Sequence, residues 1–265
     1  MDPASLKPAP LRSVKTARRI VARGPFRSRF YFQNPLHREN ITRALDALGD
    51  LRSSRVLDYG CGARVLTTEI LAREARMVVA LDADFEALKI LRSRLSEEAR
   101  QRVLVVVSDA HAMALKDAAL DAAFGLGIMH HLDLGKALPD LSRILKPDAP
   151  GAFVEPLGHN PLVNLFRRLT PAMRERGEHP LTMGDIEEVR ARFDAVEHHE
   201  SQLLSIGALA LRAIPWAGER LFRIAIVPLA AIDRRALRSL PSLRKYAWTT
   251  VITFRRRAIG PASLQ

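Results

Sequence analysis

The stretch Val56-Leu57-Asp58-Tyr59-Gly60-Cys61-Gly62-Ala63 decides the fold, because a short apolar run ends there in an acid and is followed by a turn rich in glycine. Glycine lets the backbone turn tightly and approach a ligand that a Cβ atom would block. The turn leads into a predicted helix over 66–76, whose unpaired N–H groups favour a negatively charged or polar group. The stretch therefore predicts a strand, a ligand-binding turn and a helix.

Apolar runs of the same kind recur along the chain. Strands that are apolar throughout and alternate with helices indicate a parallel sheet that is covered on both faces. The fold class predicted is α/β, with a Rossmann-like, doubly wound, mostly parallel sheet of seven strands. The predicted strands are 55–58, 77–82, 103–107, 120–126, 151–155, 195–203 and 247–254, and the predicted helices of the core are 41–48, 66–76, 85–99 and 134–145.

The chain divides into four parts. Residues 1–39 form a basic leader with a cap helix, in which Val14, Ala17, Ile20 and Val21 recur at helical spacing. Residues 40–160 are expected to form the core, with the first five strands and the glycine-rich turn. Residues 161–257 supply helices on the substrate side, the last two strands and, at about 203–246, a helical insertion between them that Pro228 is expected to break. Residues 258–265 form a tail.

The composition excludes several classes of protein. The chain has 265 residues and a formal net charge of +12, with an ordinary share of apolar residues for a globular protein. Its single cysteine, Cys61, argues against a disulfide framework and against a multi-cysteine metal site, so we expect no metal. We expect no transmembrane helix and no secretory signal, since the apolar runs are too short.

The spacing of the strand-end acids indicates a nucleoside ligand. Asp82 ends the second apolar run, and a carboxylate at that position accepts hydrogen bonds from ribose hydroxyls in nucleotide-binding sheets of this type. Asp109 follows the third run. A dinucleotide fingerprint would need a glycine where the chain has Val65, so the ligand is a different nucleoside cofactor.

Four segments resemble the motifs of the class I S-adenosylmethionine-dependent methyltransferases, and they follow in the family's order over roughly residues 50–160. The resemblance implies S-adenosylmethionine as cofactor and, within the family, the enzymes that methylate small molecules. The segments are Asp58-Tyr59-Gly60-Cys61-Gly62, Ala80-Leu81-Asp82, Ser108-Asp109-Ala110, and Arg143-Ile144-Leu145-Lys146-Pro147 with the strand to Glu155.

The resemblance also implies which residues surround the cofactor. The first turn, with Asp58, Tyr59, Gly60, Cys61 and Gly62, would flank the methionine part. Asp82 and Ala83 would hold the ribose, Asp109 and Ala110 would border the adenine, and Met129 with His130 would lie beside the sulfonium.

Position 64 departs from the family pattern, which usually continues with a third glycine where this chain has Arg64. The arginine could point outward from the first turn of the helix. It could also crowd the methionine end of the cofactor, where a second positive charge is unfavourable for the sulfonium.

Histidine is the natural base for removing a proton from a phenol or enol acceptor. His130 and His131 follow the fourth strand, and His159 follows the fifth. Glu155 could orient such a base or bind the acceptor. His179, on a later loop, is a further candidate. A packing or hydrogen-bonding role stays open for each histidine.

The function expected is methylation of a hydrophobic small molecule, such as a quinone-, polyketide- or lipid-like acceptor, with oxygen as the favoured target atom. Apolar helices with arginines at their edges, over 203–246, could be a second layer on the sheet, a lid, or a contact with an anionic membrane. We therefore expect a cytoplasmic protein with a peripheral membrane contact left open. A non-catalytic binding protein stays open because of Arg64. Methylation of RNA is disfavoured because the charge is dispersed and no base-flipping motif follows strand four.

Overall fold

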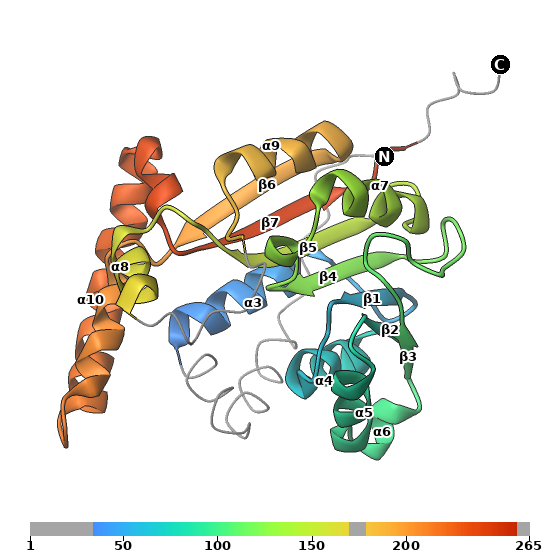
Figure 1. The fold of residues 1–265 in the computed structure, drawn as a ribbon, viewed down its shortest axis with the longest axis horizontal. Helices are drawn as coiled ribbons and strands as arrows, with labels where there is room; N and C mark the ends of the chain where they lie inside the picture. The colour runs from blue at the N-terminus through green and yellow to red at the C-terminus, as the bar shows by residue number, and fades with distance from the viewer. Residues whose placement is uncertain (1–33, 170–178, 259–265) are drawn as a thin grey trace, which may run out of the picture.

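The computed structural model describes residues 34–169 and 179–258 of the chain. Its centre is one seven-stranded sheet in the order β3-β2-β1-β4-β5-β7-β6 (Figure 1). All neighbouring strands pair in parallel except β7, which runs antiparallel to both β5 and β6. The predicted mostly parallel sheet of seven strands is thus confirmed. The strands are β1 Arg55–Tyr59, β2 Met77–Asp82, β3 Val103–Val107, β4 Ala122–Leu126, β5 Pro150–Pro156, β6 Asp194–Ser201 and β7 Thr249–Arg255.

Helices cover both faces of the sheet and bury its central strands. All five residues of β4 are buried, as are four of the five in β1. One apolar cluster joins the sheet to α3, α4, α5 and α6, and a second joins it to α7 and α9. The bounds are α3 Pro35–Ala47, α4 Val65–Glu74, α5 Phe85–Arg94, α6 Glu97–Arg100, α7 Leu134–Ile144, α8 Pro161–Leu169 and α9 Met183–Arg192.

The helix before β1 begins earlier than its apolar pattern predicts. The sequence predicts a start at Ile41, whereas α3 begins at Pro35. Asn34 caps this helix, because its side-chain oxygen accepts a hydrogen bond from the Leu36 N–H at 3.0 Å. A proline in the first helical position has no N–H to satisfy, so it also favours this start.

The single helix predicted over 85–99 is wrong, because the structure has two helices there. α5 ends at Arg94, and α6 begins after the N-cap Ser96. The Ser96 N–H donates to Glu69 Oε1 on α4 at 2.6 Å, and its hydroxyl accepts from the Ala99 N–H at 3.3 Å. A tertiary contact and a local cap thus satisfy the backbone where the helix breaks.

The insertion between the last two strands is helical, as its composition predicts. It contains the 3-10 helix η5 Ser205–Ala213, the long helix α10 Gly218–Ser239 and the 3-10 helix η6 Pro241–Tyr246. The expectation that Pro228 breaks this segment is wrong, since α10 runs through it. Pro228 lies on the exposed side of α10, where water can satisfy the backbone carbonyl that the proline leaves without a donor.

One buried carboxylate fastens α10 to the end of β6. Asp233 Oδ2 accepts from the backbone N–H groups of Leu203 and Ser205, at 2.9 and 3.0 Å, and from the Ser205 hydroxyl at 2.6 Å. Its Oδ1 accepts from the Leu204 N–H at 2.8 Å. The long helix is therefore held at the edge of the sheet where β6 ends.

Two expectations concern residues that the structure does not describe. The basic cap helix falls within 1–33, and most of the tail lies beyond residue 258. Within the described ranges, none of the helices has the length and apolar character that a membrane crossing requires.

The β1 turn gives a direct test of the local packing. Gly60 has φ +65°, and a Cβ placed on it would lie 2.3 Å from Ile128. We expect Gly60→Ala to lower the free energy of unfolding by about 1 kcal/mol for the left-handed conformation and by a further 1–3 kcal/mol, roughly, for the collision. Urea denaturation of the purified protein measures the sum of these two losses.

Gly49→Ala is the matched control. Gly49 has φ +75°, but a Cβ placed on it would have no atom within 4 Å, so this variant should show only the conformational part. Equal losses in the two variants would contradict the close approach of Ile128 to the turn.

Candidate functional site

The polar residues predicted at the strand ends lie together at the carboxyl edge of the sheet. Parallel pairing sets Asp58 beside Ala80 of β2 and Phe124 of β4, and it sets Asp82 beside Val107 of β3. Because the carboxyl ends of parallel strands share one edge, the turns after β1, β2, β4 and β5 meet there. This edge is the candidate site.

The turn after β1 is hydrogen-bonded directly to the end of β2. The N–H groups of Gly60 and Cys61 both donate to the Leu81 carbonyl, at 2.9 and 3.1 Å. The Gly62 N–H donates to Asp82 Oδ2 at 2.7 Å, and the Asp84 N–H donates to Asp82 Oδ1 at 2.9 Å. The Asp82 carboxylate is therefore held in one orientation and is still partly exposed.

Asp58 lies under this turn and is almost completely buried. The hydroxyl of Thr68 donates to its Oδ2 at 2.6 Å. Burial raises the pKa of Asp58 to about 6, although the Thr68 hydrogen bond and the charge of Arg64 act in the opposite direction. Thr68 was not identified from the sequence, where it reads as an ordinary residue of the helix.

Three of the predicted cofactor residues direct their side chains into the core. Tyr59, Cys61 and Met129 are each at most 2% exposed. The Tyr59 hydroxyl donates to the Ala110 carbonyl at 2.7 Å, which fixes the loop after β3 against β1. Burial raises the pKa of the Cys61 thiol well above its usual range, so it is a poor nucleophile. Only the backbone of these three residues could contact a ligand.

The acid after β3 is exposed and paired with a histidine. Asp109 Oδ1 accepts from the His111 N–H at 2.8 Å and lies 2.7 Å from His111 Nδ1. The same ring accepts, through Nε2, the N–H of Asp133 at 3.0 Å. His111 was missed in the sequence, and no spacing rule would have found it. Ala110 is buried beside Asp109, and Ala83 is exposed beside Asp82.

Arg64 turns toward the end of β4. It is the N-cap residue of α4, and its guanidinium donates a hydrogen bond to the Leu126 carbonyl. A Cβ on the neighbouring Gly127 would lie 3.7 Å from Arg64 Nη1. The guanidinium thus lies beside the carboxyl end of β4 and the following Gly127.

Arg64 also lowers the pKa of a histidine that the sequence analysis did not identify. His37 on α3 is buried, and burial together with the charge of Arg64 lowers its pKa to about 3. His37 is therefore neutral at physiological pH. It lies in a helix where its type and spacing give no functional signal.

The strongest chemical arrangement at this edge is a buried pair of His130 and Glu155. Glu155 is fully buried, and its Oε2 lies 2.8 Å from His130 Nδ1. Its Oε1 accepts from the N–H groups of Ile128 and Met129, both at 2.9 Å. The sequence analysis named both members of the pair, and the structure brings them together.

The other predicted histidines are placed less favourably. The His131 ring centroid lies 4.0 Å from that of His130, but the residue is exposed. His159, after β5, is exposed as well. His179 reaches the site through its backbone, since its N–H donates to the His130 carbonyl at 2.9 Å.

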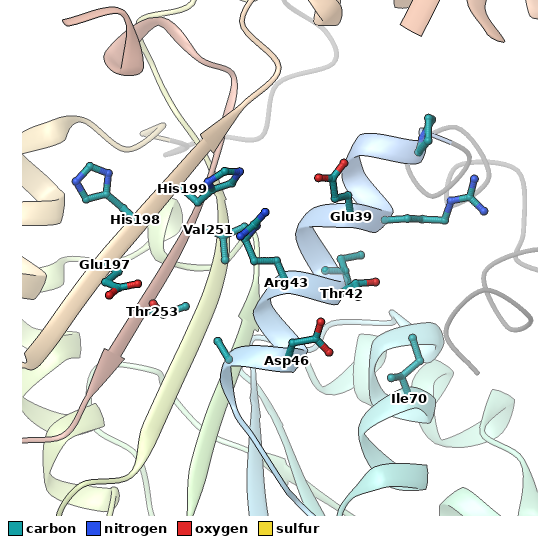
Figure 2. Close-up of a pocket in the computed structure, with 14 residues that line it drawn as sticks. Glu39, Thr42, Arg43, Asp46, Ile70, Glu197, His198, His199, Val251 and Thr253 are labelled. Carbon is teal, nitrogen blue, oxygen red and sulfur yellow. The ribbon is translucent and has the colours of Figure 1, made fainter. Parts of the chain in front are cut away.

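A cavity lies away from this edge, on the side of the sheet that α3 covers. It has a volume of about 1070 Å³ and is lined by α3, Ile70 of α4 and residues of β6 and β7, among them Arg43, His198 and His199 (Figure 2). None of the predicted site residues lines it. The volume of a cavity therefore does not indicate where the candidate site lies in this molecule.

Residues 57–153 match a family model described as a methyltransferase domain. Malonyl-[acyl-carrier protein] O-methyltransferase of Pseudescherichia vulneris is 29% identical over 212 residues, which cover 78% of this chain and 71% of that protein. Geranyl diphosphate C-methyltransferase from Streptomyces coelicolor superposes with a TM-score of 0.61 at 13% identity, over 90% of this chain and 87% of that one. Residues 57–153 of the chain form a class I S-adenosylmethionine-dependent methyltransferase domain.

The resemblance of the motifs to this family is thereby confirmed, and the cofactor of this methyltransferase is S-adenosylmethionine. A further relative, the ubiquinone biosynthesis O-methyltransferase of Xanthomonas oryzae pv. oryzae, is 33% identical over 118 residues. That match covers 43% of this chain and 49% of the relative.

The residues at the carboxyl edge fit S-adenosylmethionine. Gly62 has φ +52°, a left-handed conformation that favours glycine and that directs its N–H to the Asp82 carboxylate. We propose that Asp82 receives the ribose hydroxyls, as carboxylates at this position do, that Asp109 with Ala110 borders the adenine, and that the turn from Asp58 to Gly62 faces the methionine part. The Arg64 guanidinium would then lie near the methionine part.

The raised pKa of Asp58 predicts a dependence of stability on pH. The native state holds this proton more tightly than the unfolded state, so stability should fall as pH rises from about 4 to about 6. The shift corresponds to about 3 kcal/mol. Asp58→Asn should therefore gain stability relative to the wild type as pH rises, by up to that amount at pH 7, measured by urea denaturation across the pH range.

Asp50→Asn serves as the control of opposite sign. Hydrogen bonds from Arg52 lower the pKa of the exposed Asp50 to about 2. Removing this acid should therefore lower the free energy of unfolding at pH 7 and not raise it. A stability difference between wild type and Asp58→Asn that is flat from pH 4 to pH 7 would contradict the burial of an ionisable Asp58.

The charge of Arg64 predicts that the protein binds S-adenosylmethionine less tightly, relative to S-adenosylhomocysteine, than it would without this arginine. S-adenosylmethionine carries a sulfonium charge that S-adenosylhomocysteine lacks, and a nearby guanidinium repels it. Calorimetric titration of Arg64→Gln should show the affinity for S-adenosylmethionine rising relative to S-adenosylhomocysteine by about 1 kcal/mol, or roughly fivefold.

Arg73→Gln, on the last turn of α4, is the matched control and should leave the ratio of the two affinities unchanged. An unchanged ratio in Arg64→Gln, or the same change in both variants, would place the guanidinium away from the sulfonium.

Proposed function

We propose that this methyltransferase transfers a methyl group to an oxygen atom of a hydrophobic small molecule. The observation that carries the proposal is the buried pair of His130 and Glu155, at the end of β4 and β5. A Cβ on Gly127 would lie 3.4 Å from His130 Cε1 and 3.7 Å from Arg64 Nη1, so the histidine and the turn after β1 approach the same point. This proximity supports His130 as a proton acceptor next to the proposed methionine end of the cofactor site.

Glu155 determines which nitrogen of His130 can accept a proton. An ionised carboxylate is only an acceptor, so the Nδ1 atom that faces it carries the hydrogen. In the neutral ring, Nε2 is then the basic nitrogen. The two backbone N–H groups on the other Glu155 oxygen hold the carboxylate in place, and so they orient the ring indirectly.

The proposed reaction uses this pair as a general base. The bound cofactor supplies an electrophilic methyl group. His130 Nε2 would take the proton from the acceptor hydroxyl whose oxygen receives the methyl group, and S-adenosylhomocysteine would be the leaving group. The imidazolium that results is stabilised by the Glu155 carboxylate. The remaining task of the protein is to align the acceptor and exclude water.

The named relatives support oxygen as the target. The Pseudescherichia vulneris and Xanthomonas oryzae proteins are both named as O-methyltransferases. A protein of similar fold is named as a C-methyltransferase. Methylation at carbon is therefore the alternative outcome that an analysis of the product would detect. His131, His159 and His179 are alternative bases if His130 proves dispensable.

The surroundings of the edge support a hydrophobic acceptor. The helices α8 and α10 and the 3-10 helix η5 follow β5 and β6 in the chain. Leu162 and Leu165 of α8 and Leu204, just before η5, are exposed apolar side chains in this part. We also propose that the protein is cytoplasmic and acts at an anionic membrane surface. The structural argument for the membrane contact comes from α10.

His130→Gln tests the proposed base. We expect kcat to fall by about 10²–10⁴, while the affinity for S-adenosylhomocysteine stays within a small factor of the wild type. Turnover is measured as S-adenosylhomocysteine release with a panel of apolar phenols, hydroquinones and carboxylic acids. Glu155→Gln should lower kcat as well, because the amide cannot stabilise the imidazolium.

The pair of His198 and Glu200 on β6 offers the matched control, since Nδ1 lies 2.6 Å from a glutamate oxygen there too. His198→Gln should keep its activity. Full turnover in His130→Gln with an acceptor that the wild type methylates would overturn the assignment of the base.

A further inference from the structure

The outer side of α10 carries an exposed apolar stripe with arginines at both ends. Phe222, Ile226, Ala230, Asp233 and Leu237 form its buried side. We call the opposite side, with the preceding turn, the α10 face. Its exposed members are Trp216, Arg220, Leu221, Arg223, Ile224, Val227, Ile232, Arg234, Arg235 and Arg238.

The apolar side chains occupy the middle of this face. Ile224 is 62% exposed and Val227 is 63% exposed, which is a high degree for β-branched apolar residues. Their spacing of three residues places them on one side of the helix. Trp216, in the turn before α10, is fully exposed and has φ +60°. Large apolar side chains that gather on one exposed face mark a contact surface.

The charge of the face identifies the kind of partner. Five arginines and one exposed glutamate lie along α10, and the glutamate is already paired with Arg212 and Arg223. Arg220 and Arg223 flank the apolar middle on one side along the helix, and Arg234, Arg235 and Arg238 flank it on the other. An amphipathic helix of this pattern lies in the plane of an anionic bilayer, with its apolar side among the acyl chains and its arginines at the phosphates.

A second copy of the chain fits this face poorly. Any twofold pairing of α10 with itself would bring arginines of one helix against arginines of the other, because both ends of the stripe are basic. An anionic lipid surface meets both ends with opposite charge. Tryptophan is also enriched at the depth of lipid headgroups, where one end of its ring is apolar and the other polar.

We propose that the α10 face docks this methyltransferase on an anionic phospholipid surface. Asp233 fixes α10 to the residues that follow β6, so the docked helix is rigidly connected to the carboxyl edge of the sheet. Figure 1 shows α10 standing across this end of the molecule, with α8 beside it. The docked enzyme would present the edge that carries His130 toward the membrane, where a hydrophobic acceptor is dissolved. This inference deepens the membrane part of the proposed function, and methyl transfer can stand where docking fails.

Vesicle co-sedimentation of the full chain tests the docking. We expect binding to vesicles made from equal parts of phosphatidylcholine and phosphatidylglycerol, weak binding to phosphatidylcholine alone, and loss of binding in high salt. Arg234→Gln with Arg235→Gln should weaken binding by at least about tenfold, because each arginine near the surface contributes on the order of 1 kcal/mol. Ile224→Ser with Val227→Ser should weaken it as well.

Matched control variants lie at the β3 end of the sheet, whereas α10 contacts β6 at the other end. Arg92→Gln with Arg94→Gln removes two exposed arginines from α5, and Leu104→Ser removes an exposed leucine from the edge strand β3. Both should bind vesicles like the wild type. Thermal melting and titration with S-adenosylhomocysteine show that each variant is folded, and they separate a failure of docking from a failure of the cofactor site.

Three results would overturn the proposal. One is equal binding to neutral and anionic vesicles. Another is an equal loss in the α5 and α10 arginine variants, which would show that only the overall charge matters. The third is retention of vesicle binding in the Ile224 and Val227 variant, which would exclude insertion of the apolar stripe.

Discussion

Parallel hydrogen bonding between β1, β2, β4 and β5 is the constraint on which the rest of the molecule depends. It brings together at one edge residues that are far apart in the sequence, such as Asp58, Asp82 and Glu155. The backbone then closes the arrangement, because the turn after β1 bonds to Leu81 and Asp82 of β2. A one-residue change of register would reverse the side on which each of these side chains lies.

The second requirement is that the buried charge at this edge be satisfied. Burying the Glu155 carboxylate is costly unless it receives hydrogen bonds. Two backbone N–H groups after β4 donate to one of its oxygens, and His130 Nδ1 lies 2.8 Å from the other. The stability of the turn after β4 and the orientation of the proposed base therefore rest on the same side chain. Asp233 plays a similar part for α10, so the proposed membrane contact is joined to the end of β6, at the same edge of the sheet as the candidate site.

The fold and much of the candidate site follow from the sequence because the central strands are short apolar runs with acids at their ends. That pattern needs no knowledge of packing, and it locates Asp58, Asp82, His130 and Glu155. The break between α5 and α6 does not follow, since it depends on Glu69, a residue of another helix. The direction of Arg64 and the proximity of His37 to it depend on how α3 and α4 meet the sheet. His111 is found only once the loops after β3 and η3 are seen to touch.

The central claim is that the cofactor lies across the turns after β1, β2 and β3. Hydrogen–deuterium exchange of the full chain, with and without S-adenosylhomocysteine, tests it most directly because it reports on the backbone of every turn at once. The account predicts slower exchange at Gly60–Gly62, at Asp82–Asp84 and at Asp109–His111 when the ligand is present. Protection confined to α3 and β6, beside the large cavity, would contradict it, as would an exchange pattern that the ligand leaves unchanged.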